Sequence, residues 1–297
     1  MKLPFVTLDV FTRARFAGNP LAVVLDADGL DATVMQSIAR EFGHPETVFV
    51  LTPSAAGNTA RARIFTPAVE MPFAGHPTVG TAVALTLRRG AGADVLLEEQ
   101  IGVLNCRVAL EGVDRGYASF VVPSPPVETG PPASDQAIAA ALGLGTGDIG
   151  FDGHGPSKWT LGNSFTLVPV HGIDAVRRCT VDDARWDAAF ESPDRSFAFV
   201  FCADPVDRAN SFHARMFAPR AGVREDPATG SAAAAFCGFC AQSLKLGNGE
   251  HRFVIEQGFE MGRPSLIALE LTLLDDRLSS ASVGGPAIIV TEGTVEA

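Results

Sequence analysis

Residues 226–239 read DPATGSAAAAFCGF, and residues 74–87 read AGHPTVGTAVALTL. Each stretch passes from a polar turn into a run of small, apolar residues that has almost no polar face. A helix that is apolar on all sides is buried on all sides, and both runs are shorter than the ~18 residues of a membrane span. Each stretch is therefore predicted to be a short central helix that strands approach closely.

The two helical stretches belong to a longer internal repeat. Each follows an Arg-x-Phe-x-Pro motif, which is RIFTP at 63–67 and RMFAP at 215–219. Earlier in each half, a Gly-Asn pair opens an apolar run, within FAGNPLAVVL at 16–25 and LGNSFTLVPV at 161–170. Because the three features follow the same order twice, the sequence predicts two related domains.

Between the predicted helices, the chain contains short runs rich in Val, Ile, Phe and Leu that are bounded by Gly, Pro or Asn, a pattern typical of strands. We therefore expect an α+β fold in which each domain is a strongly curved sheet around one buried helix. Surface helices are predicted at 31–42, 134–144 and 181–190. The proline-rich stretch 119–135 is expected to connect the two halves.

Composition disfavours several classes of partner. The chain has 297 residues, of which 46% are hydrophobic, and its net charge is −11. No basic run is present, so a nucleic-acid or anionic-membrane surface is disfavoured, whereas a small anion bound by backbone N–H groups is compatible.

Asp9 and Arg13 interrupt the N-terminal segment, which therefore does not resemble a signal peptide. Five scattered cysteines fit reduced thiols, and we expect a cytoplasmic protein.

Two short motifs suggest cofactors that we do not expect. Cys237 and Cys240 form a C-x-x-C, but a structural zinc site needs four ligands and no second pair exists, so both are interpreted as core residues. Residues 145–150 satisfy G-x-G-x-x-G, but a predicted helix precedes them instead of the strand that dinucleotide binding requires. No cofactor and no metal are therefore expected.

The starts of the two central helices are candidate binding sites. The first N–H groups of a helix have no intrahelical partner and carry a partial positive charge, which suits a carboxylate. Thr229, Gly230 and Ser231 lie where the second helix should begin, and Gly75 and His76 where the first should. If the two halves face each other, both starts meet at one cleft. The alternative is that these residues only cap helices and form turns.

Three ionisable residues lie at junctions between loops and elements. Glu46 directly precedes an apolar strand, where partial desolvation raises the proton affinity of a carboxylate, and His76 and Asp226 stand at the two helix starts. A carboxylic acid and an imidazole at one cleft can transfer protons. The alternative is that Glu46 is a solvated residue at the start of a strand and His76 a capping or packing residue.

These motifs resemble the PhzF-like family of phenazine-biosynthesis isomerases. The resemblance covers nearly the whole chain in order, through AGNPLAVVLD, ETVFV, RIFTPAVEMPFAGHPTVGTA, REDPATGSAAAA, GRPS and VGGPAIIVTEG. It implies the diaminopimelate-epimerase fold, in which each of two similar domains is a β-roll or barrel around a central helix, with the active site between them. On this basis we expect one domain at residues 1–118, to which 284–297 return, and the other at 119–283.

The resemblance also implies roles for single residues. Glu46 is similar to the family's catalytic glutamate, which moves a proton between substrate carbons. His76 and Asp226 are similar to residues that assist this transfer and hold polar groups of the substrate. Further positions are expected to bind substrate, chiefly its carboxylate: Gly75, Thr229, Gly230, Ser231 and, more weakly, Asn19 and Asn163.

The helix starts depart from those of the racemases and epimerases that share this fold. Those enzymes use one cysteine at each helix start, and this sequence has none there. A base on each face of one carbon is therefore disfavoured, and transfer of a proton along one face by Glu46 is favoured. The predicted function is a cofactor-independent isomerase of a small carboxylate-bearing substrate, and the resemblance implies a homodimer. An epimerase, a hydro-lyase and a non-catalytic small-acid-binding protein remain alternatives.

Overall fold

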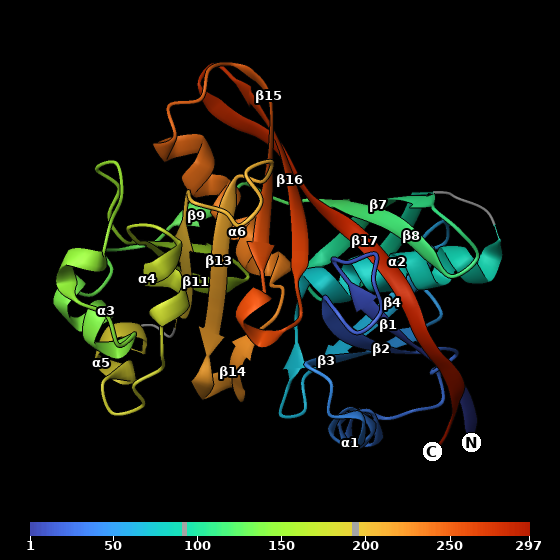
Figure 1. Ribbon diagram of the computed structural model, residues 1–297. Coiled ribbons are helices and arrows are strands. Elements are labelled where there is room, and N and C mark those ends of the chain that lie inside the picture. The colour runs from blue at the N-terminus through green and yellow to red at the C-terminus, as the bar shows by residue number, and fades with distance from the viewer. Residues whose placement is uncertain (91–93, 192–195) are drawn as a thin grey trace. The chain divides into compact units, whose positions relative to one another are not determined.

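A computed structural model describes residues 1–90, 94–191 and 196–297. The chain divides into two compact units (Figure 1). Unit 1 comprises Met1–Pro123, Arg263–Leu266 and Ser282–Ala297, and unit 2 comprises Ser124–Gly262 and Ile267–Ala281. The first transition lies inside the proline-rich stretch 119–135, five residues beyond the limit expected at 118. Arg263–Leu266 was expected in the second half but belongs to unit 1, where the Arg263 guanidinium contacts Asp9.

Unit 1 is a closed ring of strands around one helix. Hydrogen-bonded neighbours follow one another as β1, β2, β3, β4, β6, β7, β8 and β17, and β17 returns to β1. Helix α2 packs against β1, β2, β3, β6, β7 and β8, so it fills the interior of the ring. The elements are β1 (Lys2–Val10), β2 (Asn19–Val24), α1 (Ala32–Phe42), β3 (Glu46–Leu51), β4 (Ala60–Phe65), β5 (Glu70–Met71), α2 (Gly75–Arg89), β6 (Asp94–Glu99), β7 (Gly102–Leu110), β8 (Arg115–Val121) and β17 (Arg277–Glu296).

Unit 2 is also built around a buried helix, α6, which packs against β9, β10 and β11. Its elements are β9 (Val127–Glu128), α3 (Asp135–Ala141), η1 (Thr146–Asp148), β10 (Ser157–Leu161), β11 (Asn163–Pro169), α4 (Ile173–Arg178), α5 (Trp186–Phe190), β12 (Phe197–Cys202), β13 (Phe212–Ala218), η2 (Pro219–Ala221), β14 (Val223–Asp226), α6 (Gly230–Ser243), β15 (Gly249–Gln257), η3 (Phe259–Met261) and β16 (Ser265–Leu274).

The strand pairings confirm the internal repeat. In unit 1, β1–β2 is antiparallel, β2–β3 parallel, β3–β4 and β4–β5 antiparallel, and β4–β6 parallel. In unit 2, β10 to β15 pair in the same order with the same directions. The Arg-x-Phe motifs match in detail, because Arg63 pairs with Glu70 at 2.7 Å and Arg215 with Glu225 at 2.7 Å. The predicted α+β architecture is therefore correct.

Small residues let the central helices approach their surroundings closely. A Cβ atom added to Gly80 of α2 would lie 2.5 Å from Leu21 Cδ2, and one added to Gly238 of α6 would lie 2.3 Å from Trp159 Cζ3. Cys237 and Cys240 are fully buried free thiols of α6, in agreement with the core interpretation. No helix of the described residues is long and apolar enough to cross a membrane.

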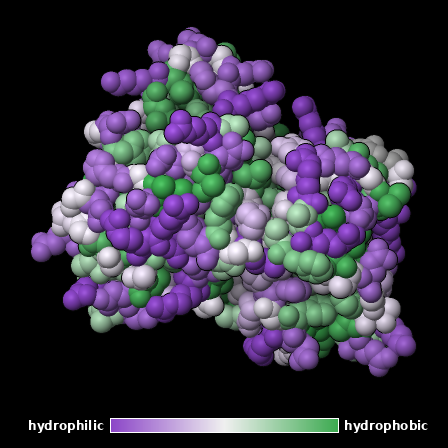
Figure 2. Space-filling model, viewed as in Figure 1, coloured by the Kyte–Doolittle hydropathy of each residue, from purple (hydrophilic) through white to green (hydrophobic). Residues whose placement is uncertain are grey.

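The surface helices agree in part with expectation. Helix α1 occupies the range predicted at 31–42, and Asp31 caps it by accepting hydrogen bonds from the N–H groups of Thr33 and Val34. The helix predicted at 181–190 is shorter, Trp186–Phe190, because a turn closed by Asp182 precedes it. Over the face shown in Figure 2, hydrophilic residues predominate and hydrophobic residues lie between them, since the long apolar side chains are mostly in the cores.

Candidate active site

Three predicted site residues of unit 1 lie together. Asn19 begins β2 and Glu46 begins β3, and these strands run parallel with Leu21 opposite Glu46, so both starts lie at one end of the sheet. His76 is in the first turn of α2. The Asn19 amide nitrogen lies 3.1 Å from His76 Nδ1, and Glu46 Oε2 lies 3.3 Å from His76 Nε2. The chain thus assembles an amide, an imidazole and a carboxyl in one row.

Burial determines the charge state of His76. The residue is 2% exposed, and burial, together with the nearby His44, lowers the pKa of the His76 imidazole to about 3. The ring is therefore neutral near pH 7, with one N–H donor and one acceptor nitrogen. Because the Asn19 amide nitrogen can only donate, Nδ1 is the acceptor of the neutral ring, and Nε2 carries the hydrogen that faces Glu46. The side chain of Glu46 is 15% exposed, so it is the accessible end of the row.

Arg263 braces the turn that carries Asn19, a role that the sequence reasoning missed. Its guanidinium donates to the carbonyls of Ala17 and Gly18, both at 2.7 Å, and to Asp9 Oδ1 at 2.5 Å. Gly18 has a φ of +64°, and an added Cβ would lie 2.3 Å from the Val10 carbonyl oxygen. Only glycine fits this turn without strain. The sequence does show the GRPS motif that contains Arg263, but the turn that Arg263 binds is far away in the sequence.

The start of α2 presents backbone donors that no side chain caps. Its N-cap residue is Ala74, which has no side-chain oxygen to cap the first turn. Gly75 and His76 are the first two helical residues, and Pro77 has no N–H. The N–H groups of Gly75 and His76, together with the positive end of the helix dipole, form an environment suited to a carboxylate.

The predicted residues of unit 2 form a second cluster. Asp226 ends β14, and its Oδ2 accepts a hydrogen bond of 2.5 Å from the Thr229 hydroxyl. Gln257, which the sequence reasoning missed, ends β15 and binds the same loop. Its amide donates to the Asp226 carbonyl at 2.7 Å and to Thr229 Oγ1 at 3.0 Å, and accepts from the Thr229 N–H at 3.1 Å. These bonds fix the loop that leads into α6.

Gly230 and Ser231 are the first two residues of α6, and Thr229 is its N-cap residue. The Thr229 hydroxyl bonds to Asp226 and makes no capping hydrogen bond to the helix. The first N–H groups of α6 therefore resemble those of α2. Asp226, Thr229 and Ser231 are each 6% exposed. Asn163 begins β11, as Asn19 begins β2.

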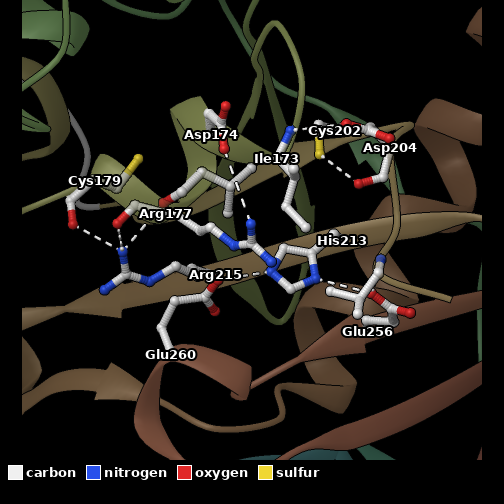
Figure 3. Close-up of polar contacts among 12 residues, drawn as sticks. Ile173, Asp174, Arg177, Cys179, Cys202, Asp204, His213, Arg215, Glu256 and Glu260 are labelled. Atoms are coloured by element: carbon white, nitrogen blue, oxygen red, sulfur yellow. Dashed lines mark hydrogen bonds and ion pairs between the residues drawn. The ribbon is translucent and has the colours of Figure 1, made fainter.

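A second buried network of unit 2 was not expected from the sequence. His213 of β13 lies between two carboxylates, with Nδ1 at 2.9 Å from Glu256 Oε2 and Nε2 at 2.8 Å from Glu260 Oε1 (Figure 3). Burial opposes the charged ring, but both carboxylates favour it, and the pKa of His213 is raised. Glu256 also accepts from the N–H groups of Val206 and Asp207. Because Glu256 precedes Gln257 on β15, the network fixes the strand end that holds Asp226.

The structure thus brings Asn19, Glu46, His76 and Gly75 together in unit 1, and Asp226, Thr229, Gly230 and Ser231 together in unit 2. That the two helix starts share one cleft stays a prediction. Within residues 1–90, 94–191 and 196–297, no group of three or more His, Cys, Asp or Glu side chains is placed to hold a metal ion.

Comparisons with known proteins identify the family. The family model for phenazine biosynthesis-like protein matches residues 8–293. An uncharacterized isomerase of Mesorhizobium japonicum is 46% identical over 97% of each chain. Trans-2,3-dihydro-3-hydroxyanthranilate isomerase of Pseudomonas chlororaphis is 35% identical over 98% of each chain. The crystal structure of a PhzF-family phenazine biosynthesis protein of Bacillus anthracis matches with a TM-score of 0.89 at 27% identity, covering 100% of both chains. The chain therefore belongs to the phenazine biosynthesis-like (PhzF) family, and it is an enzyme of the isomerase class.

Proposed function

We propose that the enzyme is a cofactor-independent isomerase of a small carboxylate-bearing substrate, and that Glu46 transfers the proton. The observation that carries this proposal is the partly exposed Glu46 carboxyl 3.3 Å from a buried imidazole. His76 stays neutral at working pH because burial lowers its pKa to about 3. Glu46 can therefore gain and lose a proton beside a partner that keeps one charge state.

The proton transfer balances without an oxidant or a reductant. The Glu46 carboxylate removes a proton from one substrate carbon, and the electron pair of that C–H bond moves into an adjacent π system. The double bond shifts, and the Glu46 carboxylic acid returns the proton to a different carbon on the same face. The product has the composition of the substrate, as an isomerisation requires, and the starting state of Glu46 is restored.

The substrate class follows from the helix starts and from the named relatives. The N–H groups of Gly75 and His76 are suited to a carboxylate, and those of Gly230 and Ser231 have the same local arrangement. The Pseudomonas chlororaphis relative acts on trans-2,3-dihydro-3-hydroxyanthranilate by its name. We assign this chain a similar small, unsaturated acid, with Asp226, Thr229 and Ser231 binding its polar groups and Asn19 orienting His76.

The decisive experiment measures turnover of trans-2,3-dihydro-3-hydroxyanthranilate as a probe substrate in D₂O. Glu46→Gln should lower kcat by about 10²–10⁴-fold, the range for loss of a general acid/base. Glu41→Gln, on the exposed surface of α1, is the matched control and should keep wild-type turnover. Full turnover by Glu46→Gln would reject the mechanism. Deuterium that exchanges into the starting carbon with loss of configuration, without a shifted double bond, would indicate an epimerase instead.

A second experiment asks whether both clusters serve one reaction. Asp226→Asn and Glu46→Gln are measured singly and together, since residues that act in one step have non-additive effects on kcat. We expect Asp226→Asn to lower kcat and to add little to Glu46→Gln. Unchanged turnover in Asp226→Asn would remove unit 2 from the chemistry.

A cytoplasmic location and a homodimer stay predictions, and sedimentation of the purified protein tests the second.

A further inference from the structure

Glu99 of unit 1 occupies the position of Gln257 in unit 2. In the parallel pair β4–β6, Arg61 lies opposite Glu98, and in the matching pair β13–β15, His213 lies opposite Glu256. Glu98 and Glu256 bind equivalent loops. Glu98 accepts hydrogen bonds from the backbone N–H groups of Ser54 and Ala55 and from the side-chain amide of Asn58. Glu256 accepts hydrogen bonds from the backbone N–H groups of Val206 and Asp207 and from the side-chain amide of Asn210. The residues that follow, Glu99 and Gln257, are therefore equivalent.

Gln257 shows what this position does. Its uncharged amide makes three hydrogen bonds to the loop before α6, at Asp226 and Thr229. Glu99 serves the matching helix start in unit 1, because its Oε1 lies 2.7 Å from the hydroxyl oxygen of Thr78 in the first turn of α2. A residue that carries a carboxyl thus stands where the repeat uses a neutral amide.

The hydrogen atoms at Thr78 determine the charge of Glu99. The Thr78 hydroxyl oxygen lies 2.9 Å from the Ala74 carbonyl oxygen and 2.7 Å from Glu99 Oε1. A hydroxyl has one hydrogen to donate, and a carbonyl oxygen can only accept. If Thr78 donates to Ala74, as threonines in helices commonly do, the hydrogen in the second contact must come from Glu99. With an ionised Glu99, the two contacts would have to share the one hydrogen of the Thr78 hydroxyl.

We infer that Glu99 is a neutral carboxylic acid in the working enzyme and a positioning residue, whose O–H donates to Thr78 and thereby holds the helix turn that carries His76. Its surroundings agree with this assignment. Glu99 is 8% exposed, and its Oε2 has no hydrogen-bond partner among the described residues, which would be costly for a charged carboxylate. The inference about His76 rests on the proposed function, whereas the charge of Glu99 does not.

The two groups that face Glu99, the Thr78 hydroxyl and the Cys106 thiol, carry no positive charge. Thr78 faces it from α2, and the Cys106 thiol faces it from β7, where burial raises the thiol pKa and keeps that group neutral. His76, in the same turn of α2, is directed to Asn19 and Glu46. Burial raises the pKa of Glu99 to about 8, and this effect exceeds the lowering that the Thr78 hydroxyl would cause as a donor to the ionised carboxylate. The proton should therefore leave only in mildly alkaline solution.

Glu99 belongs to a set of contacts that fix the loop before α2. The Ile101 N–H, in the turn after β6, donates to the Pro72 carbonyl at 3.2 Å. Phe73 packs edge-on against Phe120, with ring centroids 5.6 Å apart. Of these contacts, the bond from Glu99 to Thr78 is the one that changes with a proton. Loss of that proton would place a buried charge on Glu99 of β6, beside Thr78, which is two residues after His76 in α2.

The first test measures the charge directly in the full-length protein without substrate. Carbon-13 NMR of protein labelled at the glutamate carboxyl carbon should show one protonated carboxyl at pH 7, absent from Glu99→Gln and retained in the exposed control Glu41→Gln. The amide resonances of Gly75 and His76 should shift with the same alkaline midpoint in wild type and not in Glu99→Gln. An ionised Glu99 at pH 7 would overturn the inference, as would amide resonances that ignore its titration.

The second test uses turnover of the probe substrate. Glu99→Leu, which removes the hydrogen bond, should lower kcat by about 10- to 100-fold through misplacement of His76. Glu99→Gln, which supplies an N–H donor as Gln257 does, should restore most of that loss and should lack the alkaline decline of wild type. Equal damage in the two variants would overturn the positioning role. Should Glu46→Gln retain turnover, the proposed function fails, while the NMR titration still decides the charge of Glu99.

Discussion

The starts of α2 and α6 share one framework and differ in their ionisable groups. In the register of the strand pairs, Met71 lies opposite Ile64, and Asp226 lies opposite Met216. Met71 and Asp226 are therefore equivalent positions, and each stands four positions before the first residue of its central helix. His76 therefore corresponds to Ser231. The register of the parallel strands likewise matches Glu46 with Phe197, because each pairs with the residue two positions after the Gly-Asn turn.

The two units share the contacts that hold the central helix in place and differ in the ionisable residues near its start. Both units retain the Arg–Glu pair, a carboxylate that binds the preceding loop, and a polar side chain at the strand end that fixes the helix start. Unit 1 alone adds the carboxyl of Glu46 and the imidazole of His76, whereas unit 2 adds Asp226. Equal structural requirements would have kept similar residues, so we propose that the differing positions are the functional ones.

Replacing the unit 1 residue by its unit 2 counterpart should give the largest effect. His76→Ser should lower kcat by about 100-fold, because Glu46 loses the neutral partner beside which it changes protonation. Ser231→Ala, the matching truncation in unit 2, should cost only about tenfold, the value of one hydrogen bond to a charged group. Steady-state kinetics on the probe substrate measures both. Equal losses would contradict the division of roles between the two helix starts.

The two buried histidines should give opposite pH dependences of stability. The pKa of His76 is lowered to about 3, so the unfolded chain binds the additional proton between pH 6.5 and 3, and His76 stabilises less as pH falls. The pKa of His213 is raised, so its contribution is present below its unfolded pKa and is lost as pH rises through the folded value. The slope for His76 approaches about 1.4 kcal/mol per pH unit, and the slope for His213 has the opposite sign.

Urea unfolding from pH 5 to 8 tests this opposition. Relative to wild type, His76→Gln should become more stable as pH falls. The deficit of His213→Gln should be greatest at the acidic end and should shrink toward pH 8. Parallel curves for the two variants would show that the environments of the two rings do not differ in the way described.

Packing around the two helices should also differ. Gly238→Ala should destabilise unit 2 by about 1–3 kcal/mol, because the added Cβ meets the rigid indole of Trp159. Gly80→Ala should cost less, since its added Cβ meets methyl groups of Leu21 and Val10 instead of an aromatic ring, whereas the gain in helix propensity of about 1 kcal/mol is common to both positions. Thermal unfolding with far-UV circular dichroism measures the two changes. A larger cost at Gly80 would be the contrary result.

The smallest expected difference concerns the Arg–Glu pairs. Arg215 is 10% exposed in its side chain and also donates to the carbonyls of Val176 and Cys179, whereas Arg63 is 27% exposed. Glu225→Gln should therefore cost about 1–3 kcal/mol, and Glu70→Gln about 0.2–1 kcal/mol. Chemical denaturation in low and high salt compares them. The Glu70→Gln effect should fall with salt more than the Glu225→Gln effect, and the reverse order would contradict the burial argument.

The sequence predicted the parts of the site that are local. The position of Gly75 and His76 at one helix start, and of Gly230 and Ser231 at the other, followed from an apolar run after a polar turn. Glu46 was placed correctly at a strand start because the apolar run after it is continuous. Arg263, Gln257 and Glu99 escaped notice as site residues, since each acts on a loop far from it in the chain.

By itself, the sequence determined the two buried helices, their repeat and the residue types at their starts, because periodicity, small side chains and turn residues act over a few neighbouring positions. Only the tertiary structure decided that Asn19, Glu46 and His76 meet, since parallel pairing of β2 with β3 brings distant segments to one end of the sheet. It also decided the charges. The proton affinities of His76, His213 and Glu99 depend on how completely the surrounding fold removes water and which partners it leaves.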